Sequence, residues 1–193
     1  MAGETRSNVR KSHSLLPGSL FCTLMIVLAS VVVQMRASPP LNEYISNTIS
    51  SKKPYETFEQ FYPHYLREHS QQTTRLWHYV GTTLFILYML VNPALLFPIL
   101  AGGLSAYSVM PFFRHLSNGL GEVGVFFIVY LIGGKLITRS YKKVFLPLLL
   151  GYSFAWIGHF FYEQNKPATF IYPTFSLMGD FRMVYDAIRK QTL

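Results

Sequence analysis

Four ionisable residues, His69, His78, His159 and Glu163, are of the types that hold metal ions in enzymes. His159 and Glu163 are four residues apart at the end of an apolar stretch, so a helix would place them on one face. If the apolar stretch lies in a membrane, burying an ionisable side chain there costs free energy, and such residues usually have a function. Two or three imidazoles with a carboxylate suit Fe(II), Mn or Zn. The alternative is that His159 and Glu163 only hydrogen-bond each other, and that His69 and His78 are interfacial.

The spacing of His69 and His78 sets a condition on the chain between them. Nine residues correspond to two and a half helical turns, which would place the two rings on opposite faces of one helix. The imidazoles can converge only if the chain turns between them. The run at 71–74 offers such a break, with Thr73 or Thr74 as an N-cap.

Several other kinds of catalytic site have no support in the sequence. It contains no HExxH, P-loop, GxGxxG or GxSxG motif, and it lacks the histidine boxes of membrane desaturases. The one cysteine, Cys22, lies in an apolar run and has no disulfide partner within the chain. Serine or cysteine nucleophile chemistry is therefore not expected.

The composition is that of a membrane protein. Half of the 193 residues are hydrophobic and only 13% are charged, whereas soluble domains carry about 25% charged residues. The mean hydropathy is +0.25. The net charge of +8 comes from basic residues that flank apolar segments, which fits contact with anionic lipid better than binding of nucleic acid.

The order of apolar and polar segments predicts an all-α, polytopic membrane helical bundle with interfacial amphipathic helices. Residues 1–50 hold a basic start, an apolar segment at 15–35 and a linker. The apolar segment reads as a signal anchor, with a cleaved signal peptide as the alternative. Residues 51–193 are expected to form the membrane-embedded catalytic domain. Its apolar helices are expected at 76–91, 94–110, 121–138 and 144–162.

Two polar, aromatic segments border these helices. Aromatic residues at three- and four-residue spacing in 55–74 predict an amphipathic helix, and a short helix is expected over 180–190 with Asp180 near its start. An even number of crossings places the polar residues around 64–78 and 159–182 on one side of the membrane. We therefore expect a single polar site built from both ends of the bundle.

Five stretches of this chain form a recognisable set: 65–69, 75–82 with its Arg-x-x-His-x-x-Gly-Thr pattern, 151–163, 165–170 and 179–183. Together they resemble the 2-hydroxy fatty acid dioxygenase family of small membrane proteins. The resemblance covers roughly residues 55–190. Two departures are Gln71-Gln72, where the family often has Asn-Pro, and a longer connection over about 102–143. The extra length, about 35 residues, is enough for two more crossings.

The resemblance implies an Fe(II)-dependent dioxygenase, a multi-pass protein of the endoplasmic reticulum membrane. Its substrates would be O₂ and a 2-hydroxy long-chain fatty acid, and its product the acid one carbon shorter. The metal-binding histidines of the family match His69, His78 and His159. Glu163 lies in the same motif, as a possible ligand or partner of a ligand.

The substrate carboxylate would need a basic partner, for which the candidates are Arg75, Lys166 and Arg182. Each of these is read more simply as an interfacial basic residue. Two other functions remain open on the sequence: a different metal-dependent membrane lipid hydroxylase or oxidase, and a non-enzymatic membrane scaffold protein.

Overall fold

The structure is a computed structural model that describes residues 52–190, and in this range it contains helices and no strand. The prediction of an all-α fold is confirmed. The longer helices are α3 (Phe58–Arg67), α4 (Gln72–Val91), α5 (Leu96–Val109), α6 (Leu120–Thr138), α7 (Tyr141–Ile157) and α8 (Pro173–Lys190). The expected signal anchor at 15–35 and the rest of the N-terminal region 1–50 lie outside the described residues.

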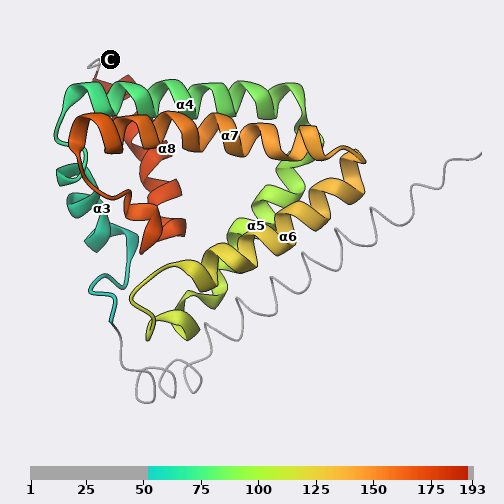
Figure 1. Cartoon of the computed structure of the whole chain (residues 1–193), viewed down its shortest axis with the longest axis horizontal. Coiled ribbons are helices and arrows are strands. Elements are labelled where there is room, and N and C mark those ends of the chain that lie inside the picture. Colours follow the sequence, from blue (N-terminus) through green and yellow to red (C-terminus); the bar gives the residue numbers. More distant parts are fainter. Residues whose placement is uncertain (1–51, 191–193) are drawn as a thin grey trace, which may run out of the picture.

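Two antiparallel helix pairs meet at one end of the molecule and diverge towards the other (Figure 1). One pair is α4 with α7, and the other is α5 with α6. At the narrow end, the 3₁₀ turn η1 (Pro93–Leu95) links α4 to α5, and Arg139 and Ser140 link α6 to α7. The buried Tyr130 of α6 fixes this end, because its hydroxyl donates to the carbonyl oxygen of Val144 at 2.7 Å.

Glycines allow the helices of each pair to approach closely. A Cβ atom on Gly81 of α4 would lie 3.0 Å from Cβ of Phe154 and 3.2 Å from the carbonyl oxygen of Gly151. A Cβ atom on Gly102 of α5 would lie 3.1 Å from the backbone oxygen of Phe126. Small residues at such crossings let helices pack through their backbones, as they do in membranes.

Three of the apolar helices in residues 52–190 are long and apolar enough to cross a membrane. They are Pro93–Phe113, Leu120–Thr138 and Tyr141–Glu163, with 21, 19 and 23 residues. Helix α4 corresponds to the predicted apolar helix at 76–91, but its first turn is polar and it is not among these spans. Large side chains such as Phe97, Ile128 and Leu149 are exposed on the outer faces, as lipid contact requires.

Helices α3 and α8 close the wide end between the two pairs (Figure 1). Helix α3 begins after Thr57, whose hydroxyl accepts a hydrogen bond from the amide of Gln60 at 3.3 Å. Its Phe61 and Tyr65 are fully buried in a cluster that includes Phe175 of α8. The prediction of an amphipathic helix within 55–74 is therefore confirmed.

Two predicted helix starts are wrong. Helix α4 begins at Gln72, with Gln71 as N-cap, so the chain breaks at 68–71 and neither Thr73 nor Thr74 is a cap. Helix α8 begins at Pro173, seven residues before Asp180, which lies in its middle. The helix continues through Gly179 because that glycine packs on Tyr65: an added Cβ would lie 2.9 Å from the tyrosine ring.

Candidate metal centre

The first histidine, His69, lies in the short connection between α3 and α4. Its ring is fully buried and lies 4.1 Å, centroid to centroid, from the ring of Tyr65 one turn earlier. The Nδ1 atom lies 2.6 Å from the backbone oxygen of Tyr65. Arg75 holds the connection from the other side, since its Nε donates to the backbone oxygen of His69 at 2.6 Å. The chain therefore turns between His69 and His78, as their convergence requires.

The second histidine, His78, lies in α4 and faces α8. Its Nδ1 atom is 2.6 Å from Oδ1 of Asp180. The same carboxylate oxygen accepts a hydrogen bond from the hydroxyl of Tyr65 at 2.5 Å. Tyr65 and Asp180 thus connect the surroundings of His69 and His78.

The third histidine, His159, lies in a π-helical turn, Gly158–Glu163, that continues α7. Such turns add a residue to the helical repeat and are frequent at functional sites. Gly158 brings this turn against α4, because an added Cβ would lie 3.0 Å from Cγ2 of Thr74. The Nδ1 atom of His159 lies 2.7 Å from Oδ1 of Asn165, and the Asn165 amide nitrogen donates to the backbone oxygen of Glu68 at 2.9 Å.

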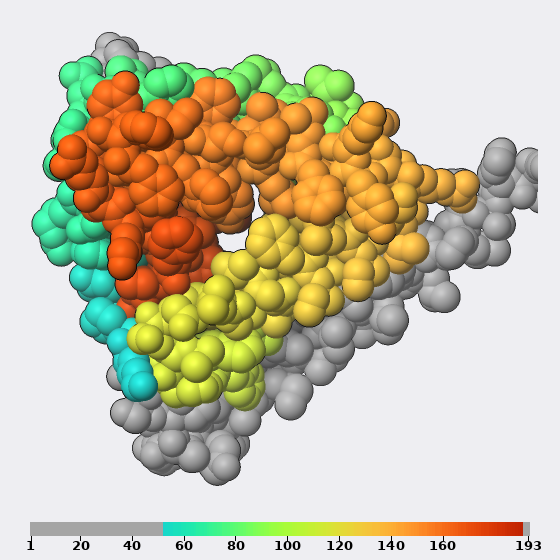
Figure 2. Space-filling view, viewed as in Figure 1, coloured from blue at the N-terminus to red at the C-terminus, as the bar shows by residue number. Residues whose placement is uncertain are grey.

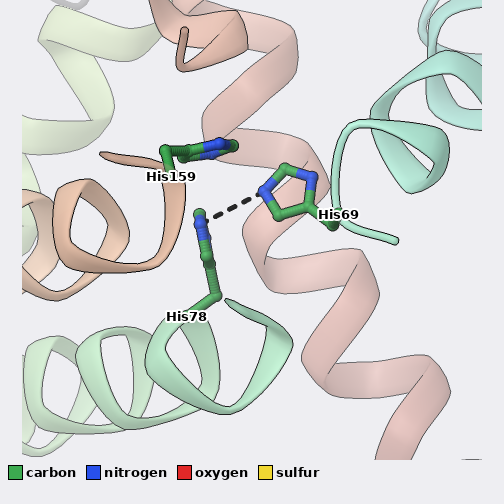
Figure 3. Close-up of side chains that lie close together, drawn as sticks. All are labelled: His69, His78 and His159. Carbon is green, nitrogen blue, oxygen red and sulfur yellow. Dashed lines mark hydrogen bonds between the residues drawn. The ribbon is translucent and has the colours of Figure 1, made fainter. Parts of the chain in front are cut away.

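The three imidazoles converge on one point (Figure 3). Each offers a ring nitrogen, and these nitrogens all lie within 4.8 Å of one another. Because Nδ1 of each ring faces an oxygen that accepts, the hydrogen of each neutral ring belongs on Nδ1 and the Nε2 lone pair points into the site. Metal-binding histidines are held by neighbouring oxygens in this way.

The contact between Nε2 of His69 and Nε2 of His78, at 3.1 Å, indicates a cation. Two lone pairs at that distance repel each other unless a proton or a metal ion lies between them. Two nitrogens bound at about 2.1 Å to one ion lie about 3 Å apart when they are neighbours in the coordination shell. The three rings are 0–4% exposed, so water does not satisfy them from outside. The donor set therefore fits a metal ion.

The electrostatics of the site favour neutral imidazole and ionised carboxylate. Burial, with the charges of His78 and His159, lowers the pKa of His69 to about 3. Burial alone would raise the pKa of Asp180, but the adjacent His78 and the hydrogen bonds from His78 and Tyr65 bring it below its ordinary value. Near neutral pH, His69 is thus in the form that binds metal, and Asp180 in the form that accepts from His78.

Glu163 lies next to this group without joining it. Its two carboxylate oxygens accept hydrogen bonds from the hydroxyl of Ser70 at 3.0 Å and from the amide of Gln71 at 2.6 Å. The four-residue spacing does not bring both side chains to one target, because His159 contacts Asn165 and Glu163 contacts the start of α4. In the structure, Glu163 binds the amide at the start of α4.

The three basic candidates for substrate binding are not gathered at the histidines. Arg75 contacts the backbone of His69 and lines a groove on the surface of α3, α4 and α8. Lys166 is exposed. Arg182 is 52% exposed and pairs with Asp186 at 3.1 Å.

Sequence reasoning missed the roles of Asp180, Asn165 and the Tyr65 hydroxyl at this site. The sequence pattern places Asp180 near the start of a helix, and this place alone is enough to account for an acidic residue. All three residues occur in the stretches that carry the family resemblance. Their location there is the sequence feature that could have marked them as part of the site. Their partners are 102, 6 and 115 residues away in the chain, respectively, so spacing alone could not identify two of the three contacts.

A cavity leads from the histidines into the space between the helix pairs. It encloses about 770 Å³, counted with its open mouths. His78, His159 and Asp180 line one part, and most of the remaining wall is apolar, with Phe85 from α4 and Phe126 from α6 among its residues. Figure 2 shows an opening into the molecule between α6, α7 and α8. We call this cavity the corridor. Its mainly apolar lining suits an apolar chain whose polar end is near the histidines.

Comparison with known proteins agrees with this geometry. No curated protein and no solved structure matches the chain. A protein family does match, over residues 55–192, which include the three histidines, Asp180, Asn165 and Tyr65. The match covers more than half of the chain, so this protein belongs to the family described as 2-hydroxy-palmitic acid dioxygenase Mpo1-like.

Proposed function

We propose that this protein is an Fe(II)-dependent dioxygenase that converts 2-hydroxy long-chain fatty acids to the acid one carbon shorter. The observation that carries the proposal is the convergence of three buried imidazoles beside an apolar corridor. Membership of the family supports the substrate class. His69, His78 and His159 would hold the metal, which would supply O₂ activation and Lewis-acid chemistry towards the 2-hydroxy acid.

Residues around the three histidines orient the imidazole rings for metal binding. Tyr65, Asp180 and Asn165 keep hydrogens on Nδ1 of the three histidines, so that His69, His78 and His159 present their Nε2 lone pairs. The apolar corridor receives the acyl chain and keeps bulk water from it. Arg75, Lys166 and Arg182 do not face the three histidines. In this proposal the substrate carboxylate would therefore be bound by the metal and not by a basic side chain.

The proposal includes the endoplasmic reticulum membrane as the site of action. The three candidate spans and the exposed apolar faces of α5, α6 and α7 support a multi-pass membrane protein. The choice of organelle rests on the family resemblance. Microscopy of a fluorescent fusion with an endoplasmic reticulum marker tests it, and a signal confined to another membrane would contradict it.

An assay of the purified protein tests the reaction. The full chain in detergent is loaded with Fe(II) without oxygen, mixed with 2-hydroxypalmitic acid and exposed to O₂, and the products are identified by mass spectrometry. We expect the acid one carbon shorter, and no such product from His159→Ala with the variant still expressed and folded. Oxygen insertion without chain shortening would indicate a lipid hydroxylase. Folded protein that binds no iron would favour a scaffold.

A further inference from the structure

A second, smaller compartment adjoins the corridor on the side of the α5–α6 hairpin. It encloses about 380 Å³, counted with its openings. Phe126, Tyr152, Pro173 and Leu177 line both spaces, so these four side chains stand between them. The rest of the wall is mainly apolar, from residues such as Ala106, Val123 and Phe127.

The charged side chain in this wall is that of Glu122, on the first turn of α6; Thr174 and Tyr152 add hydroxyl groups. The Glu122 side chain is 1% exposed. Its Oε1 atom pairs with the ammonium group of Lys53, which is also buried and comes from the segment before α3. Its Oε2 atom has no hydrogen-bond partner among residues 52–190. A buried carboxylate oxygen without a donor is costly, which indicates that a donor occupies the compartment.

The chemistry of the pair restricts the class of donor. Lys53 already balances the charge of Glu122, so a second cation would be buried without a counter-charge and is unfavourable. A neutral hydroxyl group can donate to Oε2 of Glu122 without burying a second charge. It can arrive on an apolar chain, which the walls of both spaces accommodate.

We propose that the compartment at Glu122 binds a hydroxyl group on the distal part of a lipid chain whose head lies at the three histidines. The inference rests on the proposed function, since it takes the corridor as the place of the acyl chain. The compartment would give the protein a second contact with the lipid, separated from the corridor by Phe126 and Tyr152. The protein would then favour acids hydroxylated at both ends over acids that end in a methyl group.

A matched set of ligands tests this proposal on the full chain in detergent. The probes are long-chain 2-hydroxy acids of several lengths, each ending in a methyl group, a hydroxyl or a methyl ether. The ether keeps the oxygen as an acceptor but has no hydrogen to donate. Binding is measured without O₂ by native mass spectrometry. For at least one length, we expect the hydroxyl-ended acid to bind about tenfold or more tightly than both matched acids.

A double variant locates the interaction. Lys53→Met with Glu122→Met replaces both partners of the ion pair by apolar side chains, a change that buried pairs often tolerate. The preference for the hydroxyl should disappear in this variant, and it should persist in Lys135→Met, which removes a charge from the other end of α6. Thermal unfolding confirms that both variants are folded.

The outcomes separate this proposal from the function on which it rests. If all acids of one length bind equally at every length, the compartment holds only water and the proposal is wrong, while the proposed function stands. If the folded double variant still prefers the hydroxyl-ended acid, the hydroxyl binds elsewhere and the proposal is also wrong. If none of the acids binds, the proposed function fails, and this inference fails with it.

Discussion

Tyr65 and Asp180 are the residues on which two of the three histidines depend. The backbone oxygen of Tyr65 faces Nδ1 of His69, and its hydroxyl donates to the carboxylate that faces Nδ1 of His78. One tyrosine therefore orients His69 directly and His78 through Asp180. Such neighbours orient metal ligands, and replacing one typically lowers metal affinity by about 10- to 100-fold.

Asp180→Asn should weaken metal binding about 10- to 100-fold. The amide has nearly the shape of the carboxylate, but its nitrogen can donate to Nδ1 of His78 and move the ring hydrogen to Nε2, where it blocks the metal. Titration of the purified variant with Co(II) or Fe(II) gives the affinity. The matched control is Asp186→Asn, six residues further along α8, whose carboxylate contacts Tyr62 and Arg182 instead of a histidine. Equal affinities in the two variants would contradict the role of Asp180.

The elements that carry the ligands are fixed by close contacts between α4 and the end of α7. At this scale, the π-helical turn and Gly158 decide where His159 points. A Cβ atom at residue 158 would lie 3.0 Å from the Thr74 side chain and 3.3 Å from its backbone oxygen. A side chain there must push the turn away from α4.

Gly158→Ala should therefore reduce bound metal more than it reduces stability. The displaced turn moves His159 away from His69 and His78, while the α4–α7 contact at Gly81 remains. Metal content and thermal unfolding are measured on the same preparation. Gly124→Ala is the control, because an added Cβ at residue 124 meets no atom within 4 Å and alanine favours the helix. Full metal content in the folded Gly158 variant would show that the turn can shift without moving the ring.

Glu163→Gln separates a role in metal binding from a role in holding α4. Both oxygens of Glu163 serve Ser70 and Gln71, so we expect the variant to keep its metal and to unfold at a modestly lower temperature. His159→Ala, by comparison, should lose the metal. Metal analysis of both variants decides the question, and loss of metal in Glu163→Gln would make Glu163 a ligand.

The sequence was sufficient for the parts of the fold that depend on local pattern. Apolar stretches predicted the positions of α4 to α7, and the aromatic spacing predicted α3. It was not sufficient where a distant contact decides the local structure. Helix α8 runs through Gly179, which packs against Tyr65, and α4 starts at Gln72 with Glu163 accepting from the amide of its N-cap, Gln71.

The same limit applies to the metal centre. The three histidines stand out by residue type and by the family resemblance, but the sequence contains no direct sign that Asp180 and Asn165 hold two of them. The π-helical turn also has no sequence signature of its own, and the spacing of His159 and Glu163 gives no sign that they contact different partners, Asn165 and Gln71.

On the scale of the whole molecule, the metal ligands and the α5–α6 hairpin occupy separate parts of the fold. His69, His78 and His159 come from α4, α7 and their connections. The hairpin closes the corridor from the opposite side, and its free end is tied to the segment before α3 by the Lys53–Glu122 pair and by the bond from the amide of Lys52 to the backbone oxygen of Arg114 at 2.9 Å. The hairpin can therefore shape the space for the chain without contacting the metal.

The opening between α6, α7 and α8 has a kinetic consequence (Figure 2). It is bordered by two of the helices that can cross a membrane, so a fatty acid that enters there diffuses sideways out of the lipid. The rate of turnover should then follow the mole fraction of the acid in the bilayer rather than its concentration in the whole sample. In vesicles, adding inert phospholipid at a constant total amount of acid should slow the reaction, and an unchanged rate would indicate entry from water. A dioxygenase supplied in this way would respond to the composition of its membrane, and it would consume the same quantity of substrate faster wherever the acid is concentrated within a small area of lipid.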